Sequence, residues 1–151
     1  EGVIRPGQLQ HMSAGTGVRH SEFNASPSEP LHLLQIWILP ESQGGVPKYQ
    51  EIDLSELPSE GALKLAASND GRQNSLKINQ DVLLWTGEMS ANQSLNYPFA
   101  ETRAVWLQLI KGRLIANGEA LEAGDAAALS AEKELRCHAE SDAEFLLFDL
   151  A

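Results

Sequence analysis

Short runs of apolar residues, separated by turn residues, follow one another along most of this chain. Asn117-Gly118 lies between two of these runs, and both residues tolerate the positive φ angles of a tight hairpin turn. Short strands with regularly spaced turns are typical of a sandwich or barrel, so the sequence predicts an all-β fold. From Leu76 onward the predicted strands are Leu76–Asn79, Val82–Glu88, Ser94–Tyr97, Ala104–Lys111, Arg113–Ala116, Glu119–Leu121, Ala126–Leu129, Glu134–Ala139 and Glu144–Leu150.

The first half of the chain has a less regular pattern. Short strands are predicted at Leu9–Ser13, Val18–Phe23, Tyr49–Leu54 and Leu63–Ala67. The strongest strand signal is Leu31–Leu39, which is apolar on both faces and is therefore expected in the interior of a sandwich or barrel.

A repeated pattern links the two ends of the chain. Residues 3–14 align with residues 120–131 when Gly7 is placed on Gly124, an offset of 117 residues. A repeat usually corresponds to one structural unit. Strand-like sequence precedes the second copy but not the first. We therefore expect an intact C-terminal domain over 76–151 and a partial N-terminal domain over 1–40 that lacks its front half. Residues 41–75 are expected to connect them, with strands that can complete either domain.

Composition narrows the functional classes. The 151 residues carry 21 acidic and 11 basic side chains, a net charge of −10, which argues against binding to nucleic acid or to an anionic membrane. Cys137 is the single cysteine, so no intrachain disulfide can form, as is usual in a reducing cytoplasm. No apolar run reaches the length of a membrane span, and no signal peptide is visible. We expect a cytoplasmic protein whose first residue, Glu1, is not the original start.

One short segment has the residue types of a metal site. In a strand, His20 and Glu22 would project from the same face, placing an imidazole beside a carboxylate. That pair suits Fe(II), Mn(II), Ni(II) or Zn(II), although two ligands rarely hold a metal tightly. The alternative is an exposed pair at a strand end. In the second copy Cys137 and Ala139 replace the pair, so no metal site is expected there.

Other residues with chemical potential have simpler interpretations. His11 could be a third ligand, a substrate contact in the cavity or a partly buried structural histidine. His32 is predicted to be a core histidine, and Cys137 a small buried residue rather than a nucleophile, because no basic cluster lies near it. The three tryptophans, Trp37, Trp85 and Trp106, are predicted to pack in the core.

Several stretches together resemble the pirin family. They are Val3 to Gly7, Met12-Ser13-Ala14-Gly15-Thr16-Gly17-Val18-Arg19-His20-Ser21-Glu22, Leu31 to Ile38, Ser75 to Asp81 and Glu144 to Leu150. The resemblance runs over essentially the whole chain. It implies a bicupin, in which two barrels of the double-stranded β-helix type face each other, with one metal in the N-terminal barrel.

The resemblance also implies an activity and a ligand set. Pirin-like proteins bind iron or a similar metal, and some open the flavonol quercetin with dioxygen as quercetin 2,3-dioxygenases, while a eukaryotic member acts as a transcriptional cofactor. The ligands are two histidines of an upstream His-x-His segment together with the His and Glu matched here by His20 and Glu22. The upstream segment has no counterpart in this sequence. Glu22 would also serve as the catalytic base.

Three interpretations follow. The chain could be the C-terminal part of a pirin-like dioxygenase, binding metal weakly and nearly inactive by itself. It could instead be a non-catalytic cupin that binds a small aromatic, flavonol-like molecule in the cavity of its second barrel. Finally, it could be an interaction module whose open first-barrel edges pair with another copy in a homodimer.

Overall fold

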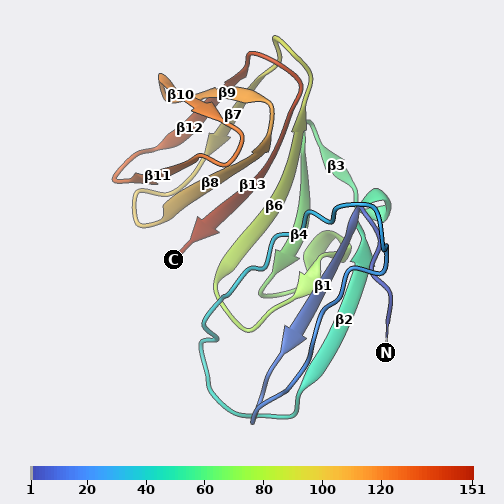
Figure 1. Ribbon diagram of the computed structural model, residues 1–151. Helices are drawn as coiled ribbons and strands as arrows, with labels where there is room; N and C mark the ends of the chain where they lie inside the picture. The colour runs from blue at the N-terminus through green and yellow to red at the C-terminus, as the bar shows by residue number, and fades with distance from the viewer. Residues whose placement is uncertain (1) are drawn as a thin grey trace.

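The computed structural model describes residues 2–151 and consists mainly of strands (Figure 1). Glu1, the first residue of the predicted N-terminal domain, lies outside the described residues. The all-β prediction is confirmed. The elements are β1 Gln8–Ser13, β2 Lys48–Asp53, η1 Leu54–Glu56, β3 Ser59–Glu60, β4 Leu63–Ser68, η2 Arg72–Asn74, β5 Leu76–Lys77, β6 Val82–Met89, β7 Ser94–Pro98, β8 Ala104–Lys111, β9 Arg113–Ala116, β10 Glu119–Glu122, β11 Ala126–Ser130, β12 Glu134–Ala139 and β13 Ala143–Leu150.

Two sheets form the C-terminal sandwich. The larger has seven strands in the order β11-β8-β13-β6-β4-β3, with β5 added in parallel to β4. The smaller has four strands in the order β10-β9-β12-β7. A third sheet has two strands, β1 and β2 (Figure 1), and packs against the outside of the larger sheet through Leu9 and Ile52.

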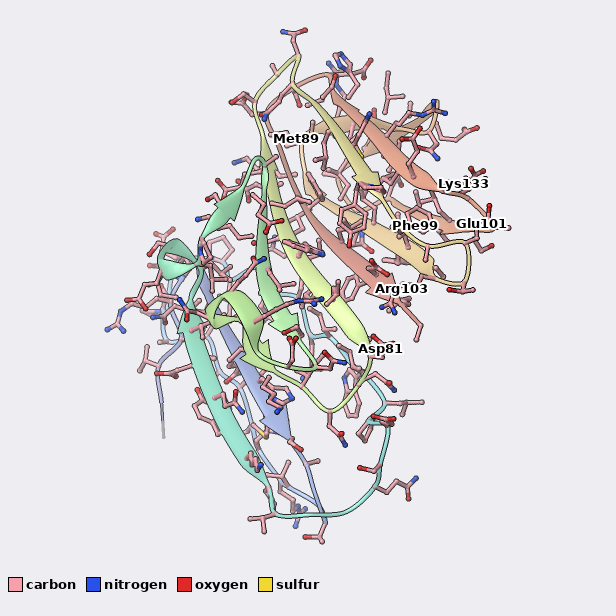
Figure 2. The ribbon with its side chains drawn as sticks, turned by 180° about the vertical axis from the view of Figure 1, so that it is seen from behind. Asp81, Met89, Phe99, Glu101, Arg103 and Lys133 are labelled. Atoms are coloured by element: carbon pink, nitrogen blue, oxygen red, sulfur yellow. The ribbon has the colours of Figure 1, made fainter. Side chains whose placement is uncertain are left out.

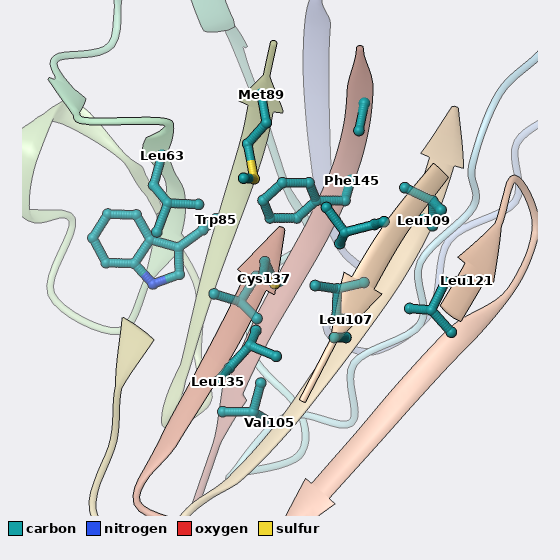
Figure 3. Close-up of a cluster of buried hydrophobic side chains, with 14 of the residues drawn as sticks. Leu63, Trp85, Met89, Val105, Leu107, Leu109, Leu121, Leu135, Cys137 and Phe145 are labelled. Carbon is teal, nitrogen blue, oxygen red and sulfur yellow. The ribbon is translucent and has the colours of Figure 1, made fainter. Parts of the chain in front are cut away.

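The sandwich interior is filled with apolar side chains. Alternate residues of β8 and β13, such as Leu107 and Phe145, point into it and are almost fully buried. Figure 3 shows these side chains converging with Trp85, Met89 and Leu135. The interior of the sandwich is therefore packed with side chains and contains no open ligand cavity among the described residues.

The larger sheet buries its other face as well. A second apolar cluster, built around Leu84 and Leu146, covers that face. Leu9 of β1, Ile52 of β2 and Ile36 pack against this cluster. One side of β1 and β2, together with the segment around Ile36, thus lies against the outside of the sandwich.

Two strand predictions in the first half are wrong. Residues 18–23 and 31–39 form no strand, and Figure 1 draws the long connection between β1 and β2 as coil. The sequence repeat explains why residues 18–23 form no strand. Residues 18–23 correspond to β12, which is hydrogen-bonded on its two sides by β7 and β9. At the offset of 117, the counterparts of those flanking strands fall before residue 1, so this segment has no ladder partner among the described residues.

The predicted burial of residues 31–39 is also wrong. Trp37 and Leu39 have 86% and 84% of their surface exposed, and His32 is exposed rather than in the core. Ile36 and Ile38 contact the second cluster, but nothing in the described residues covers the opposite side of this segment. Trp85 is in the core as predicted, whereas Trp106 is 42% exposed.

Residues 41–75 contribute strands to both parts of the structure. β2 pairs with β1, while β4 pairs with β6 and is almost wholly buried. The strand predicted weakly at Leu63–Ala67 is therefore a central element of the larger sheet. The domain boundaries at residues 40 and 76 stay a prediction.

Candidate metal centre

His20 and Glu22 lie together on an irregular segment beside β1. The His20 Nε2 and Glu22 Oε1 atoms are 3.8 Å apart, and the two side chains are 40% and 35% exposed. Donors bound to one metal at about 2.1 Å lie about 3.0–3.4 Å apart in octahedral or tetrahedral geometry. A shift of less than about 1 Å would therefore bring both donors onto one ion.

A third side chain fixes the carboxylate. The Gln10 amide donates a 2.9 Å hydrogen bond from Nε2 to Glu22 Oε1. Hydrogen bonds of this kind orient metal ligands and raise their affinity. Sequence reasoning missed Gln10, because the contact joins β1 to an irregular segment twelve positions away, and no pattern of spacing reports it.

The two donors alone make up the candidate site. Among residues 2–151, no group of three or more His, Cys, Asp or Glu side chains is arranged to hold a metal ion. The residues present therefore fit two positions of a coordination sphere, and further ligands would have to come from outside them. The metal role of His20 and Glu22 stays a prediction.

His11 projects away from this pair. It neighbours Gln10 in an extended strand, so the two side chains leave opposite faces of β1. His11 shares a face with Leu9, which packs toward the larger sheet, and its Nδ1 atom is buried without a hydrogen-bond partner. Burial lowers the pKa of His11 below its ordinary value, so the ring is neutral at pH 7. Its role as a cavity residue stays a prediction.

The position equivalent to His20 in the second copy has no comparable chemistry. Cys137 is buried in the sandwich core, and this burial raises the pKa of its thiol to about 12. The thiol is therefore protonated at neutral pH, which fits the prediction that it is not a nucleophile.

A buried polar network closes one end of the sandwich. The Tyr97 hydroxyl donates to Asp149, which lies on the inner side of β13 and is only 5% exposed. Arg103 donates from Nε to Asp149 and from Nη1 to Asp81, the latter at 3.1 Å. Figure 2 shows Arg103 and Asp81 together at this end, with Met89 at the other end of β6. Sequence analysis did not identify this network.

A groove lies outside the sandwich, beside the larger sheet. It has a volume of about 500 Å³ and runs between residues 36–39 and the larger sheet, with the aromatic side chains of Trp37, Trp106 and Phe148 in its lining.

None of the helices in residues 2–151 has the length and apolar character needed to cross a lipid bilayer.

Comparison with protein families gives two matches. The family model of the quercetinase C-terminal cupin domain matches residues 65–150, and the pirin model matches residues 1–38. Quercetin 2,3-dioxygenase of Escherichia coli K12 is 41% identical to this chain over 147 residues, which are 97% of this chain and 62% of that protein. This chain therefore spans less than two thirds of that relative.

Solved structures give the same result. The crystal structure of YhhW from Escherichia coli superposes with a TM-score of 0.91 at 40% identity, covering 98% of this chain and 62% of YhhW. A second crystal structure, of the bacterial pirin YhhW in complex with nickel(II), has a TM-score of 0.88 at 42% identity and covers 95% of this chain and 61% of its own. The predicted resemblance and the cupin fold are confirmed: this chain belongs to the pirin family.

Proposed function

We propose that His20 and Glu22 form half of the metal centre of a quercetin 2,3-dioxygenase type enzyme. The observation that carries this proposal is the 3.8 Å approach of His20 Nε2 to Glu22 Oε1, held by the hydrogen bond from Gln10. The dioxygenase name of the Escherichia coli relative and the nickel(II) complex of the related crystal structure support the binding of a divalent metal. Fe(II) or a similar ion suits an imidazole with a carboxylate.

The chain's own residues have separate tasks in this proposal. His20 would bind the metal through the lone pair of Nε2, and Glu22 would bind it through Oε1, the carboxylate oxygen that faces His20. Glu22 contacts both Gln10 and His20 through its Oε1 atom, which leaves Oε2 free. We propose that Glu22 acts as a general base and accepts the proton of a substrate hydroxyl on Oε2. A bound divalent metal would supply Lewis-acid activation of that hydroxyl and a position for dioxygen.

Two ligands per chain imply weak binding. Non-haem iron sites usually have three protein ligands or more. We therefore propose that this chain by itself binds metal weakly and has little or no quercetin-opening activity.

Calorimetric titration with Ni(II) tests the half-site. We expect weak binding to the wild-type chain, a loss of about tenfold or more in His20→Ala and in Glu22→Gln, and a smaller loss in Gln10→Ala. The matched control is His138→Ala, which removes another exposed histidine, one paired with Ser94. If Ni(II) affinity survives His20→Ala but falls in His138→Ala, the assignment of the site is wrong.

A non-catalytic binding role is the second candidate. The interior of the sandwich is filled, so we place a small aromatic, flavonol-like ligand in the groove beside Trp37 and Trp106. A groove of about 500 Å³ is within the usual size of small-molecule sites. Quercetin binding, followed by the change in its absorbance, should weaken in Trp106→Ala and stay unchanged in Leu33→Ala, since Leu33 is exposed and does not line the groove.

We also propose a cytoplasmic location. The single cysteine, Cys137, is buried as a free thiol, which a reducing compartment would preserve.

A further inference from the structure

A hollow on the outer face of the smaller sheet takes no part in the proposed metal site. It has a volume of about 410 Å³ and is lined by residues of β7, β9 and β12 and by the turn after β9. Figure 1 shows these strands on the side of the sandwich away from β1 and β2. Every lining residue lies between Ser94 and His138, within the part of the chain that the C-terminal cupin model matches. The hollow therefore belongs to the C-terminal cupin domain.

Strand pairing places four polar side chains together at this hollow. Cys137 points into the core, so its neighbours Arg136 and His138 leave the outer face of β12. The residues directly opposite them on β7 are Asn96 and Ser94. Opposite residues of paired strands lie about 5 Å apart, and alternate residues of one strand about 7 Å apart. The four side chains therefore start from the corners of a small rectangle and can reach one ligand group.

The lining of the hollow contains no carboxylate, although the chain carries 21 acidic residues and a net charge of −10. Arg136 and His138 line it, and Glu134 approaches from outside, with its Oε1 atom 3.6 Å from Nη1 of Arg136. This ion pair is longer than a hydrogen bond, and the Arg136 side chain is 65% exposed, so its donors are accessible to a ligand. Exposed charges more than about 8 Å away are screened at physiological ionic strength. The local groups therefore favour an anion despite the acidity of the chain.

The other polar groups of the hollow supply hydrogen-bond donors. Oγ of Ser94 and Nδ1 of His138 are 3.1 Å apart. If the serine donates this hydrogen bond, the ring keeps an N–H on Nε2; if the ring donates it, the serine hydroxyl keeps its proton. Either arrangement leaves a donor for a ligand. The exposed amide of Asn96 adds two more N–H groups.

The rim of the hollow is fixed by Asn117. Its Oδ1 atom accepts a 2.7 Å hydrogen bond from the backbone N–H of Arg136, and its Nδ2 atom donates at 3.1 Å to the carbonyl of Glu134. These bonds clamp the turn after β9 onto β12, directly beside the guanidinium. Ile115, which lies opposite His138 on β9, gives the hollow an apolar side. The donors thus surround a preformed site with one apolar wall.

We propose that this hollow binds the phosphate group of a small organic phosphate. The planar guanidinium of Arg136 matches two phosphate oxygens, and its charge strengthens both hydrogen bonds. Asn96 and the pair of Ser94 with His138 donate to the remaining oxygens, which a flat carboxylate does not offer. The hollow is of the size of a small-molecule site, so the organic part of the ligand lies against Ile115. The site shares no residue with the proposed metal centre.

NMR titration of the full chain with glycerol 3-phosphate, inorganic phosphate and acetate, at an ionic strength held constant with sodium chloride, tests this proposal. We expect saturable backbone amide shifts confined to β7, β12 and the turn after β9, and tighter binding of glycerol 3-phosphate than of the other two. Arg136→Gln should weaken binding at least about tenfold, and Ser94→Ala about threefold. The matched control is Arg113→Gln, which removes an exposed arginine of β9 that does not line the hollow and should change binding less than about twofold. Unchanged spectra elsewhere show that each variant is folded.

Each other outcome contradicts a specific part of the proposal. Equal binding of acetate overturns the assignment to phosphate, and equal binding of inorganic phosphate overturns the contact with an organic part. Equal losses in Arg136→Gln and Arg113→Gln would show general attraction by positive charge and no site. The absence of saturable shifts with any of the three compounds overturns the site altogether.

Discussion

The hydroxyl of Tyr97 donates a 2.7 Å hydrogen bond to the carboxylate of Asp149, joining β7 of the smaller sheet to β13 of the larger. The same hydroxyl accepts a 3.1 Å hydrogen bond from the indole Nε1 of Trp85. Arg103 donates to the other oxygen of Asp149, so both oxygens of the buried carboxylate accept hydrogen bonds. The network fixes the two sheets together at this end of the sandwich.

Replacing Tyr97 by phenylalanine should destabilise the fold by about 2 kcal/mol, because it removes a donor from a buried carboxylate and an acceptor from Trp85. Urea unfolding followed by tryptophan fluorescence measures the change. The control is Tyr49→Phe, whose hydroxyl binds Glu51 at the exposed surface and should change the free energy of unfolding by less than about 0.5 kcal/mol. Equal effects of the two substitutions would show that the network does not stabilise the fold.

Gly87 leaves room for the ring of Phe145 in the core. A Cβ atom at position 87 would overlap the ring of Phe145, so Gly87→Ala should destabilise the protein by about 3 kcal/mol through overpacking. The double variant Gly87→Ala with Phe145→Leu should be less destabilised than the sum of the two single variants, since leucine vacates this space. Strict additivity in thermal or urea unfolding would contradict the packing described.

The thiol of Cys137 makes stability depend on alkaline pH. Burial raises its pKa from 9.0 to about 12, so the native state keeps the proton that the unfolded state releases. Its contribution is fully present below pH 9 and is lost as pH rises from 9 toward 12. By pH 10 the wild-type free energy of unfolding should fall by about 1.4 kcal/mol more than that of Cys137→Ala. Parallel pH profiles of the two proteins in urea unfolding would contradict this account.

The C-terminal sandwich could be predicted from the sequence because each of its strands pairs with other strands of the same chain. Leu107 and Phe145 lie on strands whose neighbours on both sides are within the chain, so the apolar pattern and the actual burial agree. The segment 31–39 has the same apolar composition, yet Trp37 is exposed. A strand needs a ladder partner as well as apolar residues, and composition does not report whether the partner is present.

The candidate site could be predicted only in part. The residue types and the spacing of His20 and Glu22 suggested that their donors lie close together. Gln10 and the pairing of Arg103 with Asp149 depend on contacts between segments far apart in sequence. Such contacts follow from the tertiary fold and leave no local pattern.

Anomalous diffraction from crystals of this chain loaded with nickel is the most direct measurement of the central claim. The account predicts an anomalous peak about 2.1 Å from both His20 Nε2 and a carboxylate oxygen of Glu22. A peak at His138, His32 or His11 in place of this pair would contradict it.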